Sequence, residues 1–165
     1  MKRKTCVFSR QKKRLLLGLK SETHINANGR VKMEEKVEVK HVSEREIWVE
    51  KHRVYLGEDN ILYLTPVGES DEKIAIAMKE AIFKLINMVE GKVNCCVDFN
   101  KVGKQSPESR KIGKEHSEHE KTGKMAIFGT HAVARVIASF IMGVSRKKNL
   151  RFFRTKEEAL AWLKG

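Results

Sequence analysis

The sequence predicts an α/β domain with a mixed, largely parallel sheet, an N-terminal antiparallel hairpin and about four helices. One observation is the unbroken order strand, helix, strand, helix over residues 124–165. Another is a long amphipathic stretch after residue 70 that leads into the short apolar run 93–99. Strands separated by helices of about 10–20 residues imply right-handed crossovers and parallel pairing.

The antiparallel hairpin is predicted in the first half of the chain. Residues 37–56 alternate in part between apolar and charged side chains, which indicates strands. Two apolar runs, one ending at Leu56 and one beginning at Ile61, flank the turn sequence Gly57-Glu-Asp-Asn60. This arrangement is typical of a β-hairpin.

The first helix is predicted from its stripe and its end signals. Ser70 is expected to cap it, with Asp71 and Glu72 at the positive end of the helix dipole, and Gly91 to end it. The expected apolar stripe consists of Ile74, Met78, Ala81, Ile82, Leu85 and Val89.

Two further helices are predicted near the C-terminus. Thr130 is expected to cap the first, which Arg146-Lys-Lys148 would close, and Thr155 with Glu158 forms a capping box for the second. The strand between them contains Phe152 and Phe153, of which at least one must pack between the helices. The expected buried face of the earlier helix is Val133, Val136, Ile137, Phe140, Ile141 and Val144.

The segment 100–122 differs from the rest. Ser106-Pro107-Glu108 is a good helix start, with Ser as N-cap and Pro at the first helical position. Yet Ile112 is the only large apolar residue between Lys104 and Gly123. We therefore expect an exposed helix that buries little and moves relative to its neighbours.

Charge and apolar content divide the chain into an extension, 1–35, and a domain, 36–165. Residues 1–20 contain eight Lys or Arg and no acid, so they hold +8 of the formal +13. We expect a basic, disordered extension, with Met33 as an alternative start; binding of nucleic acid or an anionic membrane surface is the other hypothesis. No apolar run is long enough for a signal peptide or a membrane span, so we expect a soluble, cytoplasmic protein.

The pieces that follow the hairpin resemble the STAS domain, the fold of bacterial anti-sigma-factor antagonists, and look closest to its uncharacterised STAS/SEC14-like group. These pieces are Val97-Asp-Phe-Asn100, Lys124-Met-Ala-Ile-Phe-Gly129 and Phe152-Phe-Arg-Thr-Lys-Glu-Glu-Ala-Leu-Ala-Trp162. The resemblance implies an Asp-Ser-Ser-Gly-like motif whose serine a partner kinase phosphorylates. That motif is absent from 103–109, where Glu108 stands near the position of the serine. Glu108 either imitates a modified state or reflects divergence.

Other side chains indicate candidate chemistry, each with an ordinary alternative. Asp98 ends a strand where open α/β sheets bind ligands, or it caps the following loop. Thr130 and His131 begin a helix whose free N–H groups attract anions, or they form an ordinary turn. His116 and His119, three residues apart among carboxylates, suit a metal, or they belong to a solvated helix face. The adjacent Cys95-Cys96 pair is expected to be reduced and packed in the core.

We expect a non-enzymatic regulatory module that recognises a protein through 100–122. One alternative is a domain that binds a small anionic ligand or a lipid with the loops at Asp98 and Gly129–His131. Another is a metal-dependent enzyme centred on His116 and His119. No cofactor is expected. The residues expected to contact a partner or ligand are Asp98, Asn100, Ser106, Glu108, Ser109, Thr130 and His131.

Overall fold

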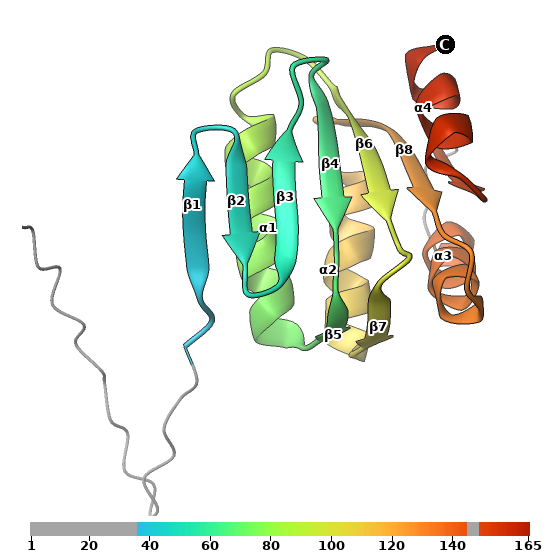
Figure 1. Cartoon of the computed structure of the whole chain (residues 1–165), viewed down its shortest axis with the longest axis horizontal. Coiled ribbons are helices and arrows are strands. Elements are labelled where there is room, and N and C mark those ends of the chain that lie inside the picture. The colour runs from blue at the N-terminus through green and yellow to red at the C-terminus, as the bar shows by residue number, and fades with distance from the viewer. Residues whose placement is uncertain (1–35, 145–148) are drawn as a thin grey trace, which may run out of the picture. The chain divides into compact units, whose positions relative to one another are not determined.

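The structure is a computed structural model that describes residues 36–144 and 149–165 (Figure 1). Residues Lys36–Gly165 form one compact unit. The extension predicted over 1–35, with its alternative start at Met33, lies outside the described residues. So does the basic cluster 146–148.

The main sheet has seven strands in the order β1-β2-β3-β4-β6-β8-β9. Pairing is antiparallel from β1 to β4 and parallel from β4 to β9. A largely parallel sheet was therefore the wrong expectation, because the region before β4 supplies a complete antiparallel meander. The strands are β1 Val39–Ser43, β2 Glu46–Val49, β3 His52–Leu56, β4 Ile61–Thr65, β6 Val93–Asp98, β8 Thr122–Phe128 and β9 Leu150–Phe153.

The predicted hairpin is confirmed as β3 and β4. Its turn is closed by the Gly57 amide, which donates to the Ile61 carbonyl at 2.9 Å, and Asn60 adopts a positive φ of 55°. Asparagine tolerates this left-handed conformation, which the tight turn requires.

A second, two-stranded parallel sheet was not predicted. It pairs β5 (Gly68–Ser70) with β7 (Val102–Gln105), and β7 leads directly into the helix over the segment 107–118. The two backbones approach so closely at Gly103 that a Cβ there would lie 2.6 Å from the carbonyl carbon of Gly68. Only glycine allows this approach, so Gly103 sets the position of β7.

The described residues form four helices, which cover the two faces of the main sheet. α1 and α2 lie behind the sheet in Figure 1, and α4 lies in front of it. α3 contributes Ala134, Ile137 and Ala138 to the larger core cluster, together with α1, whereas α4 packs a smaller cluster on the other face. The helices are α1 Glu72–Ile86, α2 Pro107–Glu118, α3 Ala132–Val144 and α4 Lys156–Lys164.

Three predicted helix ends differ in detail. The N-cap of α1 is Asp71, whose carboxylate accepts from the Ile74 amide, because Ser70 is the last residue of β5. The C-cap of α1 is Asn87, several residues before Gly91. At the start of α3, the Nδ1 atom of His131, and not Thr130, accepts from the Ala134 amide at 3.3 Å.

The predicted buried face of α3 is only partly correct. Ile137 is buried, but Val136 is 69% exposed and Phe140 is 44% exposed. The helix is apolar around most of its circumference, so its pattern could not identify the buried side. Part of this apolar surface therefore faces solvent.

Phe152 and Phe153 pack on opposite faces of the sheet, as alternation along a strand requires. Phe152 contacts the larger cluster under α1 and α3, and Phe153 contacts the smaller cluster under α4. The Phe153 ring lies 5.6 Å from the ring of Trp162. Both side chains are half-buried, so both contribute to the core.

Aromatic rings and cations stack on one face of the antiparallel half of the sheet. This is the same face that α4 covers over the parallel half. The rings of Tyr55 and Tyr63 stack at 4.7 Å between centroids. The Arg53 guanidinium lies 4.2 Å from the centroid of Tyr55, and the Lys156 Nζ lies 5.6 Å from that of Tyr63. Arg53 also donates twice to the Glu46 carboxylate, at 2.8 and 3.0 Å, which holds the guanidinium in place.

Candidate functional site

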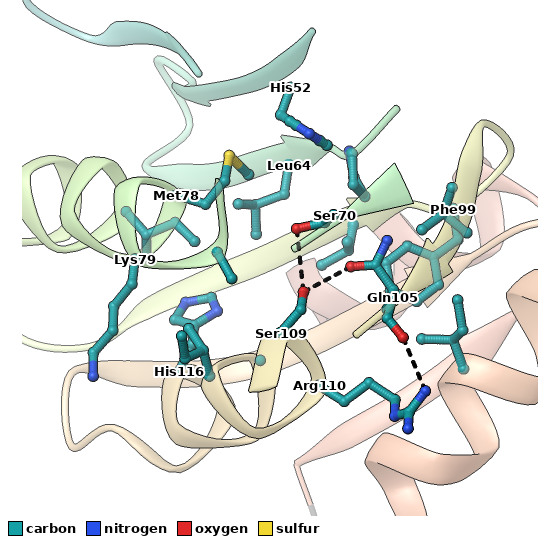
Figure 2. Close-up of a pocket in the computed structure, with 18 of the residues that line it drawn as sticks. His52, Leu64, Ser70, Met78, Lys79, Phe99, Gln105, Ser109, Arg110 and His116 are labelled. Atoms are coloured by element: carbon teal, nitrogen blue, oxygen red, sulfur yellow. Dashed lines mark hydrogen bonds between the residues drawn. The ribbon is translucent and has the colours of Figure 1, made fainter. Parts of the chain in front are cut away.

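A cavity of about 130 Å³ lies between the main sheet and helices α1 and α2 (Figure 2). Leu64, Val97 and Ile127 contribute its floor from three neighbouring strands, and Met78 and Ile82 contribute a wall from α1. These apolar side chains come from the core cluster of the domain. The cavity is thus lined mainly by core side chains and is partly open to solvent.

The roof of the cavity is the inner face of α2. Ser109, Ile112, Gly113 and His116 all line it. Their spacing of three, four and seven residues places them on one side of a helix. α2 therefore buries polar and small side chains where α1 buries large apolar ones, and the space beneath it stays unfilled. The expectation that this helix buries little holds for apolar surface, but Ser109, His116 and Ser117 are buried.

Polar groups meet at one end of the cavity (Figure 2). The hydroxyls of Ser70 and Ser109 lie 3.2 Å apart, and Ser109 donates to the Gln105 side-chain oxygen at 2.9 Å. Arg110 donates from Nη1 to the Gln105 carbonyl at 3.0 Å. Its Nε atom is buried and makes no hydrogen bond within the described part of the chain.

Two histidines line other parts of the cavity. His52 is buried, and its Nδ1 accepts from the Val67 amide at 3.1 Å. Burial is the largest effect on the pKa of His52 and lowers it. The charge of Glu50 raises this pKa, and the charge of Lys51 lowers it further. The Nε2 atom of His116 lies 3.9 Å from the Cys95 sulfur.

The Cys95–His116 contact lacks the properties of a nucleophile and its base. Burial raises the pKa of Cys95 to about 12, and the neighbouring Cys96 adds to this shift. A thiol becomes reactive when its pKa is lowered, typically by a nearby cation or helix N-terminus. The expected packing of both cysteines in the core agrees with their burial.

A separate polar cluster unites Asp98, Asn100 and Thr130, three of the predicted site residues, at the carboxyl ends of β6 and β8. The Asp98 carboxylate accepts from the backbone and side-chain amides of Asn100, both at 2.9 Å. The Asn100 side-chain oxygen accepts from the Thr130 amide at 3.1 Å, and His131 follows at the start of α3. These groups bond to one another, so they connect two loops rather than open a cavity.

The remaining predicted residues lie at the start of α2. Ser106 caps the helix by accepting from the Ser109 amide at 3.0 Å, and Pro107 occupies the first turn as expected. Glu108 is exposed in that turn. Of the residues expected to contact a partner or ligand, Ser109 alone lines the cavity; His116, a candidate metal ligand, lines it too.

The two candidate metal ligands do not share a helix face. α2 ends at Glu118, and His119 has an extended backbone with ψ of 142°. The His119 ring therefore packs against Phe83, with centroids 4.5 Å apart, whereas His116 is buried. Across residues 36–144 and 149–165, no three His, Cys, Asp or Glu side chains are grouped to hold a metal ion.

Several lining residues were missed from the sequence: His52, Ser70, Gln105 and Arg110. His52 and Ser70 lie on β3 and β5, far from α2 along the chain, so only the tertiary fold brings them to it. A signal did exist within α2 itself. The small or polar residues at 109, 113 and 116 recur at helical spacing, which indicates an inner face that cannot fill a core.

The described residues thus form an α/β domain with four helices, and its fold is SpoIIAA-like. The crystal structure of an uncharacterised DUF3478-family protein with a SpoIIAA-like fold, from Shewanella loihica PV-4, superposes with a TM-score of 0.53 at 15% identity. The match covers 68% of this chain and 91% of that one. The prediction of a STAS-like fold is thus confirmed.

The chain belongs to the family described as Domain of unknown function (DUF7793), whose model matches residues 55–165. No curated protein matches the chain. In the described ranges 36–144 and 149–165, no helix combines the length and apolar character needed to cross a bilayer.

Proposed function

We propose that this domain is a non-enzymatic, STAS-type regulatory module of the SEC14-like group that recognises a protein partner through segment 100–122 together with the adjoining helix α3. The observation that carries the proposal is the exposed apolar surface of α3 beside α2. Val136 is 69% exposed and Phe140 is 44% exposed. The Arg110 guanidinium of α2 lies 5.1 Å from the Phe140 ring centroid, so the two helices share one surface.

The outer side of α2 supplies charged groups around this apolar centre. Glu108, Lys111 and Glu115 are exposed, and Glu115 pairs with Lys79 of α1 at 2.8 Å. Protein interfaces combine an apolar, well-packed centre with a polar, hydrated rim. The surface formed by α2 and α3 has this composition, and Val136 and Phe140 are its expected centre.

The alternatives have less support. The Asp98, Asn100 and Thr130 groups expected to bind a small ligand satisfy one another's hydrogen bonds. A metal-dependent enzyme centred on His116 and His119 would need these side chains to converge, and they diverge at the end of α2.

The experiment is an affinity capture from native extract with four versions of the chain. Val136→Glu places a charge at the apolar centre, and Lys111→Glu reverses a charge on the rim. Val42→Glu is the matched control, because Val42 is 54% exposed on β1. We expect Val136→Glu and Lys111→Glu to reduce capture of a specific protein about tenfold, while Val42→Glu leaves it unchanged. Equal capture by all four chains refutes this placement of the surface.

A further inference from the structure

We propose that the cavity beneath α2 binds a small monocarboxylic acid with a single ring or a short branched chain. This inference concerns the interior of the domain and does not depend on the protein-partner surface proposed above. It rests on the volume of the cavity, the residue at position 113 and the charge of the lining.

The volume determines the size of the ligand. An engineered apolar cavity of about 150 Å³ stays dry and binds benzene. The cavity here measures about 130 Å³ and its floor is apolar, so it suits one six-membered ring or a short branched chain. A long acyl chain would require much more space than this.

Gly113 keeps the cavity open. It lies within α2 on the inner face, and a Cβ added there meets no atom within 4 Å. Its φ is not in the left-handed region, so the backbone does not require glycine. Glycine inside a helix costs about 1 kcal/mol relative to alanine. A side chain at position 113 would both stabilise α2 and occupy this space.

The charge of the lining determines the polar group of the ligand. Lys79 and Arg110 line the cavity, and none of the described residues that line it is Asp or Glu. Lys79 is paired with Glu115 at 2.8 Å, whereas Arg110 has a buried Nε–H with no acceptor among the described residues. A guanidinium is always charged and forms strong hydrogen bonds with a carboxylate or a phosphate, and the smaller carboxylate suits a cavity of this volume. The ligand's carboxylate would thus accept from Nε of Arg110 while its apolar body fills the space above Leu64 and Val97.

The hydroxyls of Ser70 and Ser109 lie at the polar end of the cavity. They lie 3.2 Å apart, and each can donate or accept. Ser109 donates to Gln105 at 2.9 Å and Ser70 donates to the Asp71 carbonyl at 3.3 Å, so a second carboxylate oxygen accepts from one of these hydroxyls only by replacing its present acceptor.

The test measures binding of three probes to the full chain by isothermal titration calorimetry. Benzoate has the expected ring and carboxylate, benzyl alcohol has the ring without the charge, and dodecanoate has the charge with a long chain. We expect benzoate to bind with a dissociation constant of about 1 mM or tighter, and at least about tenfold tighter than benzyl alcohol.

Three variants locate the site. Gly113→Leu fills the cavity and is expected to abolish benzoate binding while raising the melting temperature. Gly143→Leu is the matched control, because Gly143 also lies in a helix with open space around it but does not line the cavity. Arg110→Gln is expected to weaken benzoate about tenfold and to leave benzyl alcohol unchanged.

Four outcomes overturn the proposal. Benzoate that fails to bind the unaltered chain at about 10 mM removes the ligand class. Benzoate that binds Gly113→Leu as well as the unaltered chain places its site elsewhere. Equal binding of benzyl alcohol and benzoate removes the role of the carboxylate, and dodecanoate binding more tightly than benzoate to the same site contradicts the size derived from the cavity.

Discussion

Replacing Gly103 with alanine should separate β5 from β7 and loosen the start of α2. The new Cβ would lie 2.6 Å from the carbonyl carbon of Gly68, 2.8 Å from its oxygen and 2.9 Å from the amide nitrogen of Glu69. Non-bonded carbon atoms prefer separations of about 3.5–4.0 Å. All three contacts are with backbone, so the two strands must move apart by about 1 Å.

The cost follows from what holds the small sheet together. Its strands are tied by the Gly68 amide, which donates to the Lys101 carbonyl at 2.8 Å, and by the Ser106 amide, which donates to the Ser70 carbonyl at 3.0 Å. Each such bond contributes about 0.5–1.5 kcal/mol net. Losing both predicts that Gly103→Ala lowers the free energy of unfolding by about 1–3 kcal/mol.

Urea denaturation and amide hydrogen exchange together check this prediction. Exchange at Gly68 and Ser106 should accelerate in Gly103→Ala, while the Phe99 amide, which donates to Phe128 at 2.8 Å in the main sheet, keeps its protection. Gly113→Ala is the control, because its Cβ meets no atom and the change should stabilise α2 by about 1 kcal/mol. An unchanged unfolding free energy with unchanged exchange at Ser106 would show that the two strands tolerate the extra carbon.

Three other predictions concern the core. Phe152→Ala and Phe153→Ala should each lower the free energy of unfolding by about 2–3 kcal/mol, below the value of about 3–5 for a fully buried Phe, because both rings are half-buried. An unchanged melting temperature in either variant would contradict the packing of that ring. The pKa of His52 is lower in the folded chain than in the unfolded chain, so the unfolded chain binds a proton more readily as the pH falls. The contribution of neutral His52 to the free energy of unfolding is therefore complete above about pH 6.5 and is lost as the pH falls through the folded pKa. His52→Asn, which keeps an acceptor for Val67, should therefore flatten the fall in melting temperature between about pH 7 and pH 5, and an unchanged slope would assign that fall to other groups. Burial raises the pKa of Cys95 to about 12 and of Cys96 to about 11, so brief iodoacetamide treatment should alkylate both only in denaturant; rapid labelling of the native protein, read by peptide mass spectrometry, would show that the strand is accessible.

The elements predicted correctly are those whose signals are local. The Thr155–Glu158 capping box is present with both of its hydrogen bonds, and Ser106 caps α2. The turn between Leu56 and Ile61 joins β3 to β4. In each case a few consecutive residues contain the whole physical cause, so no tertiary context is needed.

The elements that were missed depend on contacts between distant parts of the chain. β5 and β7 are short and contain Gly68 and Gly103, so they lack a hydrophobic period. They become strands only because the fold places them side by side. Ser70 shows the same dependence, because either Ser70 or Asp71 satisfies the rules for a helix cap, and pairing of β5 commits Ser70 to a strand.

The candidate site was only partly within reach of the sequence. Asp98, Asn100 and Thr130 do come together, because parallel strands end at one edge of a sheet. The cavity beneath α2 was not predicted, because an unfilled volume follows from the residues of several elements at once. The scarcity of apolar residues in α2 indicated that this helix is unusual, but it did not indicate a cavity beneath it.

On the antiparallel half of the sheet, the side chains of Arg53 and Lys156 lie against the rings of two tyrosines. Tyr55 has Tyr63 on one side and the Arg53 guanidinium on the other, and Lys156 approaches the ring of Tyr63. A flat aromatic sheet surface on a basic protein would otherwise suit the bases of a single-stranded nucleic acid, which bind by stacking on exposed rings. Here the chain's own side chains fill those positions, and the ion pair with Glu46 at 2.8 Å holds the Arg53 guanidinium against the ring of Tyr55.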